Sequence, residues 1–319
     1  MKAIRVHDFG GPEVLRLEEI ATPEPGPGEV LVRVRAIGVN PVETYLRSGS
    51  NPNLPRPYTP GTDCAGEIEA VGEGIMALQP GDRVYTAATI TGAYAEQTLC
   101  RESAVHLLPE AVSFEEGAAL NIPYATAWRA LHQRGQGRRG ETVLIHGASG
   151  GVGLAATQIA HHMGLVVIGT AGTEQGRTLV ARHGAHHVVD HTKDGYLDDI
   201  RALTNGAGPD LILEMLSNVN LGHDAQLIAP RGRIVVIGSR GTVVINPRDL
   251  MTREADVRGL MLFNATASEL ADIHAGLRDG MEKRYIQPVI GRTLPLADAA
   301  EAHKAVLAPG AFGKIVLKP

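Results

Sequence analysis

The sequence predicts an α/β protein in which a β-rich first part is followed by a parallel sheet covered by helices. Residues 1 to about 124 contain short segments such as EVLVRVRAIGV, in which apolar and charged residues alternate between turn residues. From Val143 to about Leu262, near-continuous apolar runs are separated by helical or loop segments, as in strands that are buried on both faces. The length of 319 residues exceeds one ordinary core, so two domains are expected.

Short strands divided by turns account for the first part. The segment AGEIEAVGEG alternates and ends in a glycine turn, and Pro80, Gly81 and Asp82 form a turn before another strand. This spacing indicates a small barrel or sandwich. At about Phe114 the pattern becomes helical, with Ser113 as the helix cap and acidic residues in the first turn.

The later elements follow a strand–helix rhythm up to Leu262. The segment ASELADIHAGLRDGMEKR then predicts an amphipathic helix. The last residues predict a helix, a glycine turn and a final strand, and we expect that strand to return to the first domain.

Composition narrows the class of protein. The formal net charge is −5 and no long basic run occurs, which argues against a nucleic-acid or membrane-surface binder. Two cysteines, Cys64 and Cys100, cannot build a disulfide framework, and they favour a cytoplasmic protein. The first residues, MKAIRVHDFGG, mix charges with apolar positions, so no signal peptide is expected.

The segment ETVLIHGASGGVGLAATQIA predicts a dinucleotide-binding turn. A buried strand ends near Ile145 and a helix begins near Val152, with glycines between them. The free N–H groups and positive end of such a helix suit a pyrophosphate, and glycine lets the phosphate approach the backbone. The usual pattern G-x-G-x-x-G is incomplete because Ala148 takes the place of the first glycine. The alternative is a turn whose glycines only pack the helix against the strand.

The end of the next strand favours NADPH over NADH as the cofactor. In NAD sites an acid at this position binds the ribose, whereas LVVIGTAG ends in Ala171 and Gly172, which leaves room for a 2′-phosphate. Arg177 and His191 are candidate phosphate partners. Glu174 lies about 20 residues after the motif and is the counterargument; we interpret it as an exposed acid at a helix start.

Motifs outside the glycine turn point to a family. In chain order they are FGGPEVLRL, GVNPVETYLRSG, YTPGTDCAGEIEAVGEG, PGDRV, GAYAE, NIPYATAWRAL, HGASGGVGLAATQIA, GTAGTE, EMLSNVNL, VVIGSRG and INPRDLM. Over essentially the whole chain, the sequence resembles the zinc-independent quinone oxidoreductases of zeta-crystallin type, within the medium-chain dehydrogenase/reductase superfamily. The resemblance implies a GroES-like catalytic domain of residues 1–124 and 263–319, and a Rossmann NADP-binding domain of residues 125–262.

The same resemblance argues against a metal. Zinc-dependent members of the superfamily carry an early Cys and a His-Glu pair, whereas this chain has Asn40, Thr62 and Asp63 at those positions. Zinc requires several nitrogen or sulfur ligands in a tetrahedral array, so no metal is expected. Without a Lewis acid, the chemistry suits an acceptor that is already electrophilic, such as a quinone that is reduced by NADPH.

By resemblance, the catalytic residues are Asn40 and Tyr45. The implied cofactor contacts are Tyr45, Thr126, Ser149, Gly150, Gly151, Val152, Gly172, Arg177, His191, Asn220, Ile237, Gly238, Ser239, Arg240, Leu260, Met261 and Leu262.

Several of these residues have a structural alternative. Tyr45 could cap the barrel core, and Thr126 could bond its own backbone within a helix. Asn220 could be a helix N-cap, and His191 and Arg240 could be solvated side chains at strand ends or in loops.

Two departures from relatives and two competing functions remain open. Asn51 stands where many relatives have a tyrosine, and Gly176 stands where some bacterial relatives have a lysine.

An NADPH-dependent 2-alkenal or enone reductase is the alternative enzyme. An AU-rich RNA-binding or structural crystallin role is the alternative class of function, and the negative net charge disfavours RNA binding. We expect a homodimer or homotetramer, with the run GRIVVIGSRGTVVI as the pairing edge.

Overall fold

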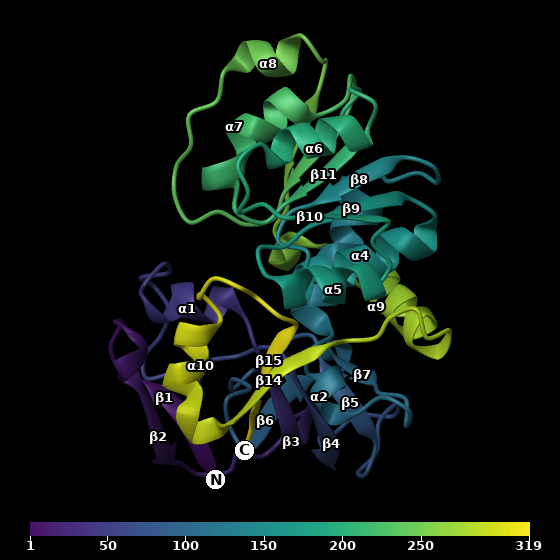
Figure 1. Cartoon of the computed structure of the whole chain (residues 1–319). Helices are drawn as coiled ribbons and strands as arrows, with labels where there is room; N and C mark the ends of the chain where they lie inside the picture. Colours follow the sequence, from purple (N-terminus) through teal and green to yellow (C-terminus); the bar gives the residue numbers. More distant parts are fainter. The chain divides into compact units, whose positions relative to one another are not determined.

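The computed structural model describes residues 1–319, and the chain divides into two compact units (Figure 1). The first unit contains Met1–Ile122, Pro288–Pro309 and Gly313–Pro319. The second unit contains Pro123–Gln287 and Gly310–Phe312.

The first unit is built around a seven-stranded sheet with strand order β14-β15-β3-β4-β5-β7, in which β6 also pairs with β3. A separate antiparallel pair joins β1 to β2. The strands are β1 Lys2–Val6, β2 Leu15–Glu19, β3 Glu29–Val39, β4 Cys64–Val71, β5 Arg83–Thr86, β6 Gln97–Arg101, β7 Val105–Leu107, β14 Ile290–Pro295 and β15 Lys314–Lys318. The helices are α1 Pro41–Arg47, α2 Phe114–Gly117 and α10 Ala299–Ala305.

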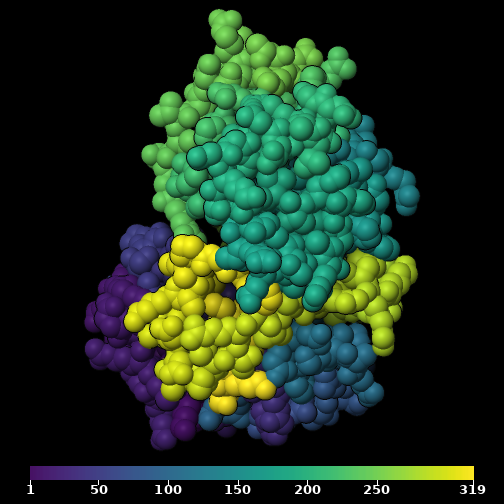
Figure 2. All heavy atoms as spheres, in the orientation of Figure 1, coloured from purple at the N-terminus to yellow at the C-terminus, as the bar shows by residue number.

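Residues from both ends of the chain form the core of this unit. β15 pairs antiparallel with β3, which confirms that the final strand returns to the first part of the chain. Ile4 packs in one apolar cluster with Leu296, Ala299 and Ala302. Accordingly, Figure 2 shows residues near the C-terminus, in yellow, beside residues near the N-terminus, in purple.

The second unit is a six-stranded parallel sheet with strand order β10-β9-β8-β11-β12-β13. Counted within the sheet this order is 3-2-1-4-5-6, the order of a Rossmann fold. Figure 1 shows α4 and α5 on one side of these strands and α6 and α7 on the other. The strands are β8 Thr142–Ile145, β9 Val166–Thr170, β10 His187–Val189, β11 Leu211–Glu214, β12 Arg233–Val236 and β13 Asp256–Gly259. The helices are α3 Thr126–Trp128, α4 Gly151–Met163, α5 Glu174–Arg182, α6 Tyr196–Leu203, α7 Ser217–Leu227, α8 Pro247–Met251 and α9 Ala267–Glu282.

Helix α9 shows where the division differs from the expected domains. The sequence assigned residues 263–319 to the first domain, but residues up to Gln287 lie in the second unit. The indole of Trp128 packs so closely on α9 that a Cβ at Gly276 would stand 2.2 Å from it. Arg129 also forms an ion pair of 2.9 Å with Glu269. The amphipathic pattern of α9 predicted a helix but not which core it covers.

The edge of the parallel sheet also differs from expectation. The run GRIVVIGSRGTVVI was expected to be an edge strand, but β12, its strand portion, lies between β11 and β13. That expectation was wrong: the edges of the sheet are β10 and β13, and β13 is the one next to β12. The mostly exposed strand β13 has the sequence DVRG, which is too short and polar to stand out as a strand.

Candidate functional site

The glycine turn lies where β8 ends and α4 begins. Gly147 has a φ of +57°, and a Cβ at Gly153 would stand 2.4 Å from the carbonyl oxygen of Gly147, so the backbone itself requires glycine at both positions. At Gly150, the N-cap of α4, a Cβ would meet nothing closer than 3.5 Å. No side chain caps this helix. The N–H of Gly150 donates to the carbonyl of Gly147 at 3.1 Å, so the uncapped N–H groups at the start of α4 are the ones that fit a phosphate group.

Ala148 fits the turn in place of the missing glycine. Its N–H donates to the carbonyl of Thr170 at 2.8 Å, at the end of β9. The neighbouring strand provides the room, because a Cβ at Gly169 would stand 3.0 Å from the Cβ of Ala148. The incomplete motif therefore keeps the geometry of a dinucleotide turn.

Three of the expected cofactor residues meet at the end of β9. The ring Nε2 of His191 lies 3.1 Å from the position of a Cβ on Gly172. Arg177 donates to Asp190 at 2.8 Å, one residue before His191. Burial, together with the positive charges of His146 and Arg177, lowers the pKa of His191, which therefore favours the neutral ring. Glu174 is exposed as the first residue of α5, as expected.

The structure explains one departure from relatives. A Cβ at Gly176 would stand 3.1 Å from the Cβ of Ser149 and 2.9 Å from the hydroxyl of Thr173. Thr173 caps α5 by accepting from the N–H of Gly176 at 3.0 Å. The phosphate turn thus packs directly on the start of α5, and any side chain at position 176 would push on Ser149. Asn51, the other departure, lies in an exposed turn.

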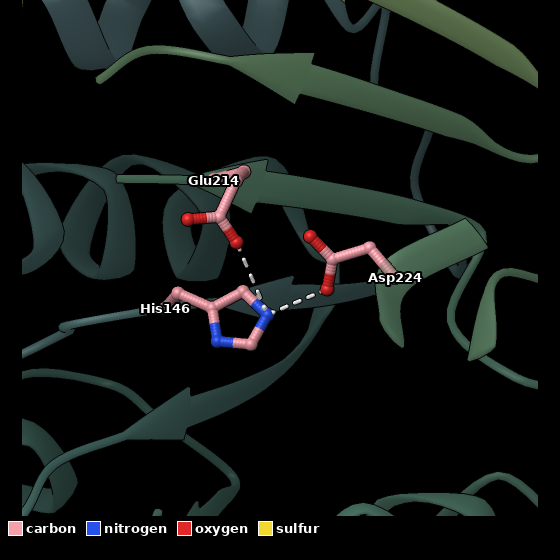
Figure 3. Close-up of side chains that lie close together, drawn as sticks. All are labelled: His146, Glu214 and Asp224. Atoms are coloured by element: carbon pink, nitrogen blue, oxygen red, sulfur yellow. Dashed lines mark hydrogen bonds and ion pairs between the residues drawn. The ribbon is translucent and has the colours of Figure 1, made fainter. Parts of the chain in front are cut away.

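A buried polar cluster lies at the carboxyl ends of β8 and β11 (Figure 3). The strand order reverses between these two strands, which is where Rossmann sheets bind their ligands. Nε2 of His146 lies 2.8 Å from Oδ1 of Asp224 on α7 and 3.5 Å from Oε2 of Glu214. Figure 3 shows the three side chains pointing toward one another.

Burial and neighbouring charges together shift the pKa values of this cluster. It raises the pKa of Glu214 to about 7, although the positive charge of His146 opposes the shift. Burial lowers the pKa of His146, but the charge and hydrogen bond of Asp224 outweigh it, so the pKa of His146 is raised. This cluster is not among the site residues predicted from the sequence. The available signal was a polar residue at the end of each of two apolar runs, in LIHG and LILEML.

Glu214 also determines the position of Asn220. Its Oε1 accepts from the backbone N–H of Leu216 and from the side chain of Asn220, the latter at 3.2 Å. Asn220 lies inside α7, whose N-cap is Leu216, so the N-cap alternative for Asn220 is wrong.

The remaining expected contacts follow β12 and β13. The N–H of Ile237 donates to the carbonyl of Glu214 at 2.8 Å, and the carbonyl of Gly238 accepts from the N–H of Ser217 at 2.9 Å. The N–H of Arg240 donates to Oδ1 of Asn218 at 2.8 Å. These bonds tie the segment after β12 to the start of α7.

The other expected cofactor contacts are three residues that follow β13 and one residue on α3. The N–H of Leu260 donates to the carbonyl of Val236 at 2.9 Å. Met261 is exposed, Leu262 is buried, and Thr126 is buried at the start of α3.

The first unit contains a second buried polar cluster, made of Asn40, Glu43, Asp63, Asn121 and Lys314. The amide nitrogen of Asn40 donates to Glu43 at 3.1 Å and to Asp63 at 3.0 Å, and its oxygen accepts from the ammonium group of Lys314. Asn121 donates to Asp63 at 3.0 Å. Both amide hydrogens of Asn40 are therefore used inside the protein.

Tyr45 lies next to this cluster in sequence. It is half-buried on α1, a helix whose N-cap is Asn40. Asn40 and Glu43 form a capping box at its first turn.

Family models match both parts of the chain. A model described as the GroES-like domain of alcohol dehydrogenase matches residues 26–110, and one described as zinc-binding dehydrogenase matches residues 151–275.

The residues of the first unit do not fit the zinc ion that the second description names. Asn40, Thr62 and Asp63 offer no thiolate and no imidazole, and the ammonium group of Lys314 lies 3.5 Å from Asp63. A zinc ion at this position would meet a buried positive charge. No function is therefore derived through a metal.

Relatives match the chain from end to end. It is 51% identical to the human protein named quinone oxidoreductase, over 99% of this chain and 97% of that protein. It superimposes on a mycobacterial structure solved with NADPH with a TM-score of 0.92 at 34% identity, and on the Escherichia coli quinone oxidoreductase complexed with NADPH with a TM-score of 0.89 at 29% identity. Both superpositions cover 100% of each chain. With this fold, this glycine turn and these relatives, the chain belongs to the quinone oxidoreductase family of the medium-chain dehydrogenase/reductase superfamily.

Proposed function

We propose that this chain is an NADPH-dependent quinone reductase that works without zinc. The observation that carries the proposal is the turn between β8 and α4, where no side chain caps the helix and where a Cβ at Gly150 would make only ordinary contacts at 3.5 Å. No acid stands at the end of β9, where Gly172 lies against His191 instead. A strand end without an acid accommodates the 2′-phosphate of NADPH better than the acidic strand end of an NAD site does.

In this proposal, different residues of the second unit bind different parts of the cofactor. The backbone of Ser149, Gly150, Gly151 and Val152 binds the pyrophosphate, with the N–H groups in the uncapped first turn of α4 as donors. At the adenosine end, Gly172 packs under the ribose, and Arg177 and His191 reach the 2′-phosphate. The guanidinium of Arg177 can do so while it keeps one bond to Asp190, because it has five N–H donors.

The remaining contacts lie toward the nicotinamide. We assign them to the segment after β12, the segment after β13 and three single residues. They are Ile237, Gly238, Ser239, Arg240, Leu260, Met261, Leu262, Asn220, Thr126 and Tyr45.

The chemistry follows from orientation rather than from an acid–base pair. NADPH, when bound, supplies a hydride. The protein binds the cofactor in one orientation and keeps the reacting atoms away from water. We assign the quinone contact to Tyr45 and the positioning of its helix to Asn40, since both amide hydrogens of Asn40 are engaged.

The assembly and the compartment are also proposals. We propose a homodimer in which β13 of one chain pairs with β13 of a second copy, because β13 is an edge strand with exposed apolar neighbours. The exposed apolar residues on and near it are Met251, Val257, Met261 and Phe263. None of the helices has the length and apolarity needed to span a bilayer. We place the protein in the cytoplasm because of its low cysteine content.

The test is to titrate NADPH and NADH separately and then follow cofactor oxidation with an ortho-quinone such as phenanthrenequinone. Fast oxidation that is selective for NADPH supports the proposal. Turnover of 2-alkenals without turnover of quinones would replace it with the enone reductase alternative. Failure to bind either dinucleotide would reduce the glycine turn to a packing device.

A further inference from the structure

A buried lysine in the first unit connects to the helix that carries Tyr45. We propose that Lys314 is a positioning residue of the reductase: its ammonium group holds the Asn40 amide in one orientation, and Asn40 fixes the first turn of α1. The inference rests on the proposed function, because Tyr45 on α1 is the residue through which this positioning would reach the quinone.

The contacts of Asn40 select one of two amide orientations. An ammonium group only donates hydrogen bonds and an ionised carboxylate only accepts them. Lys314 therefore requires the oxygen of Asn40 on its side, and the carboxylate of Asp63 requires the nitrogen on the other, at 3.0 Å. The same nitrogen also lies 3.1 Å from Glu43. Without Lys314, nothing in this set of contacts draws the oxygen to its present side.

The orientation of Asn40 matters because α1 is short. The helix has seven residues, and a helix of that length depends on its cap and its packing. The backbone N–H of Asn40 donates to Oε2 of Glu43 at 2.5 Å, which closes the first turn. The side-chain nitrogen of Asn40 donates to Oε1 of the same carboxyl group at 3.1 Å, so the amide orientation affects the group that closes the turn. Tyr45 lies two residues beyond Glu43, on the next turn of the same helix.

The buried charges of this cluster are expected to stabilise the fold less than apolar side chains would. Apolar residues of similar volume usually stabilise a core at least as well as a buried ion pair does. Lys314 packs closely here: a Cβ at Gly38 would stand 2.1 Å from the carbonyl oxygen of Ala118 and 3.0 Å from Cε of Lys314. Burial raises the pKa of Glu43 to about 8 and lowers the pKa of Lys314. Costly buried charges of this kind are enriched at functional sites.

The experiment compares Lys314→Met and Lys314→Arg with Lys318→Met. Lys318 is a matched control, since it lies on the same strand and pairs with Glu115 but is exposed. The readouts are the Kd of NADPH, the KM and kcat for phenanthrenequinone, and the Tm. For Lys314→Met we expect kcat/KM for the quinone to fall about ten-fold or more while the Kd of NADPH stays within about two-fold. Lys314→Arg keeps the charge and should recover part of the loss, and Lys318→Met should match the wild type.

A double variant separates positioning from stability. In Lys314→Met/Asp63→Asn, the carboxylate left without its cation becomes a neutral amide, so the Tm should recover. The amide of Asn40 still lacks its ammonium partner, so kcat/KM should stay low. Recovery of Tm and kcat/KM together would reduce Lys314 to a structural role and overturn the inference.

A second pair links the effect to Tyr45. If Lys314 acts through Tyr45, then Lys314→Met/Tyr45→Phe should lose no more activity than the worse single variant, because effects along one path are not additive. Full additivity would overturn the inference. A wild-type protein that binds NADPH without reducing any quinone would overturn the proposed function as well, whereas unchanged kcat/KM in Lys314→Met overturns this inference alone. If Lys314→Met does not fold, Lys314→Arg and the double variant give the same comparison.

Discussion

At the level of single residues, glycines of one turn are present for different reasons. A Cβ at Gly153 would collide with the carbonyl oxygen of Gly147 at 2.4 Å, whereas a Cβ at Gly150 would make only ordinary contacts from 3.5 Å. The backbone at Gly150 has a φ of −81° and a ψ of 175°, which alanine adopts freely. The fold therefore requires glycine at position 153. At position 150 the fold would accept alanine, so glycine there is explained by a ligand that approaches the turn.

The two glycines give a matched prediction. Gly153→Ala should lower the free energy of unfolding by about 1–3 kcal/mol, as overpacking does. Gly150→Ala should leave stability unchanged within about 0.5 kcal/mol, because a Cβ there makes only ordinary contacts. The same Gly150→Ala change should weaken NADPH binding, since the methyl group occupies the space for the phosphate. Chemical denaturation and NADPH titration measure the two effects, and unimpaired NADPH binding by Gly150→Ala would argue that no phosphate binds there.

Glu214 makes a second prediction at this scale, on pH and stability. Its pKa in the fold, about 7, lies above the ordinary value of 4.5, so its bound proton stabilises the folded state at low pH. That contribution is lost as the pH rises through about 7. Glu214→Gln resembles the protonated form and can still accept from Leu216 and Asn220. It should equal the wild type near pH 5 and be more stable near pH 8 by on the order of 1–2 kcal/mol.

Urea unfolding at the two pH values measures this difference. Glu282→Gln serves as the control, because Glu282 is exposed at the end of α9. Parallel loss of stability with pH in the wild type and in Glu214→Gln would contradict a proton held at this cluster.

At the level of elements, local sequence patterns predicted which helices and strands form, but not which elements pack against one another. The cap of α2 at Ser113 and the return of β15 were both predicted, because capping residues and a terminal strand leave local signals. The core to which α9 belongs and the edge position of β13 were not, because both depend on which surfaces meet in the fold. The buried clusters around His146 and Lys314 were missed for the same reason, since their members are up to 274 residues apart.

The edge strand gives a prediction about assembly. β13 pairs on one side only, with β12, and Val257 on it is 39% exposed. A lysine on an edge strand opposes pairing with a second copy. Val257→Lys should therefore reduce the mass in light scattering from twice 33.8 kDa to 33.8 kDa. Leu107→Lys, at an exposed apolar position of the first unit, should keep the dimer, and a monomeric wild type would remove the β13 proposal.

At the level of the whole molecule, both units bury the same kind of polar group. Each holds two carboxylates and one base: Glu43 and Asp63 with Lys314, and Glu214 and Asp224 with His146. In each cluster the base is paired with a buried carboxylate, at 2.8 Å for His146 and Asp224 and at 3.5 Å for Lys314 and Asp63. The carboxylates therefore have a partner within the chain, although they come from segments that are distant in sequence.

This arrangement predicts an enzyme that is indifferent to chelators. Dialysis against EDTA or phenanthroline should leave NADPH oxidation with a quinone unchanged, because Lys314 and His146 already pair with the buried carboxylates. The one group whose ligand atoms lie within 4.8 Å of one another is His146, Glu214 and Asp224, so it is the place where a metal would bind if this expectation fails. Loss of activity on chelation, restored by Zn²⁺ or Mn²⁺, and one metal per chain by elemental analysis would contradict the prediction. His146→Gln would then identify the site, because removing one of three ligands should abolish the bound metal while Lys314→Met should not.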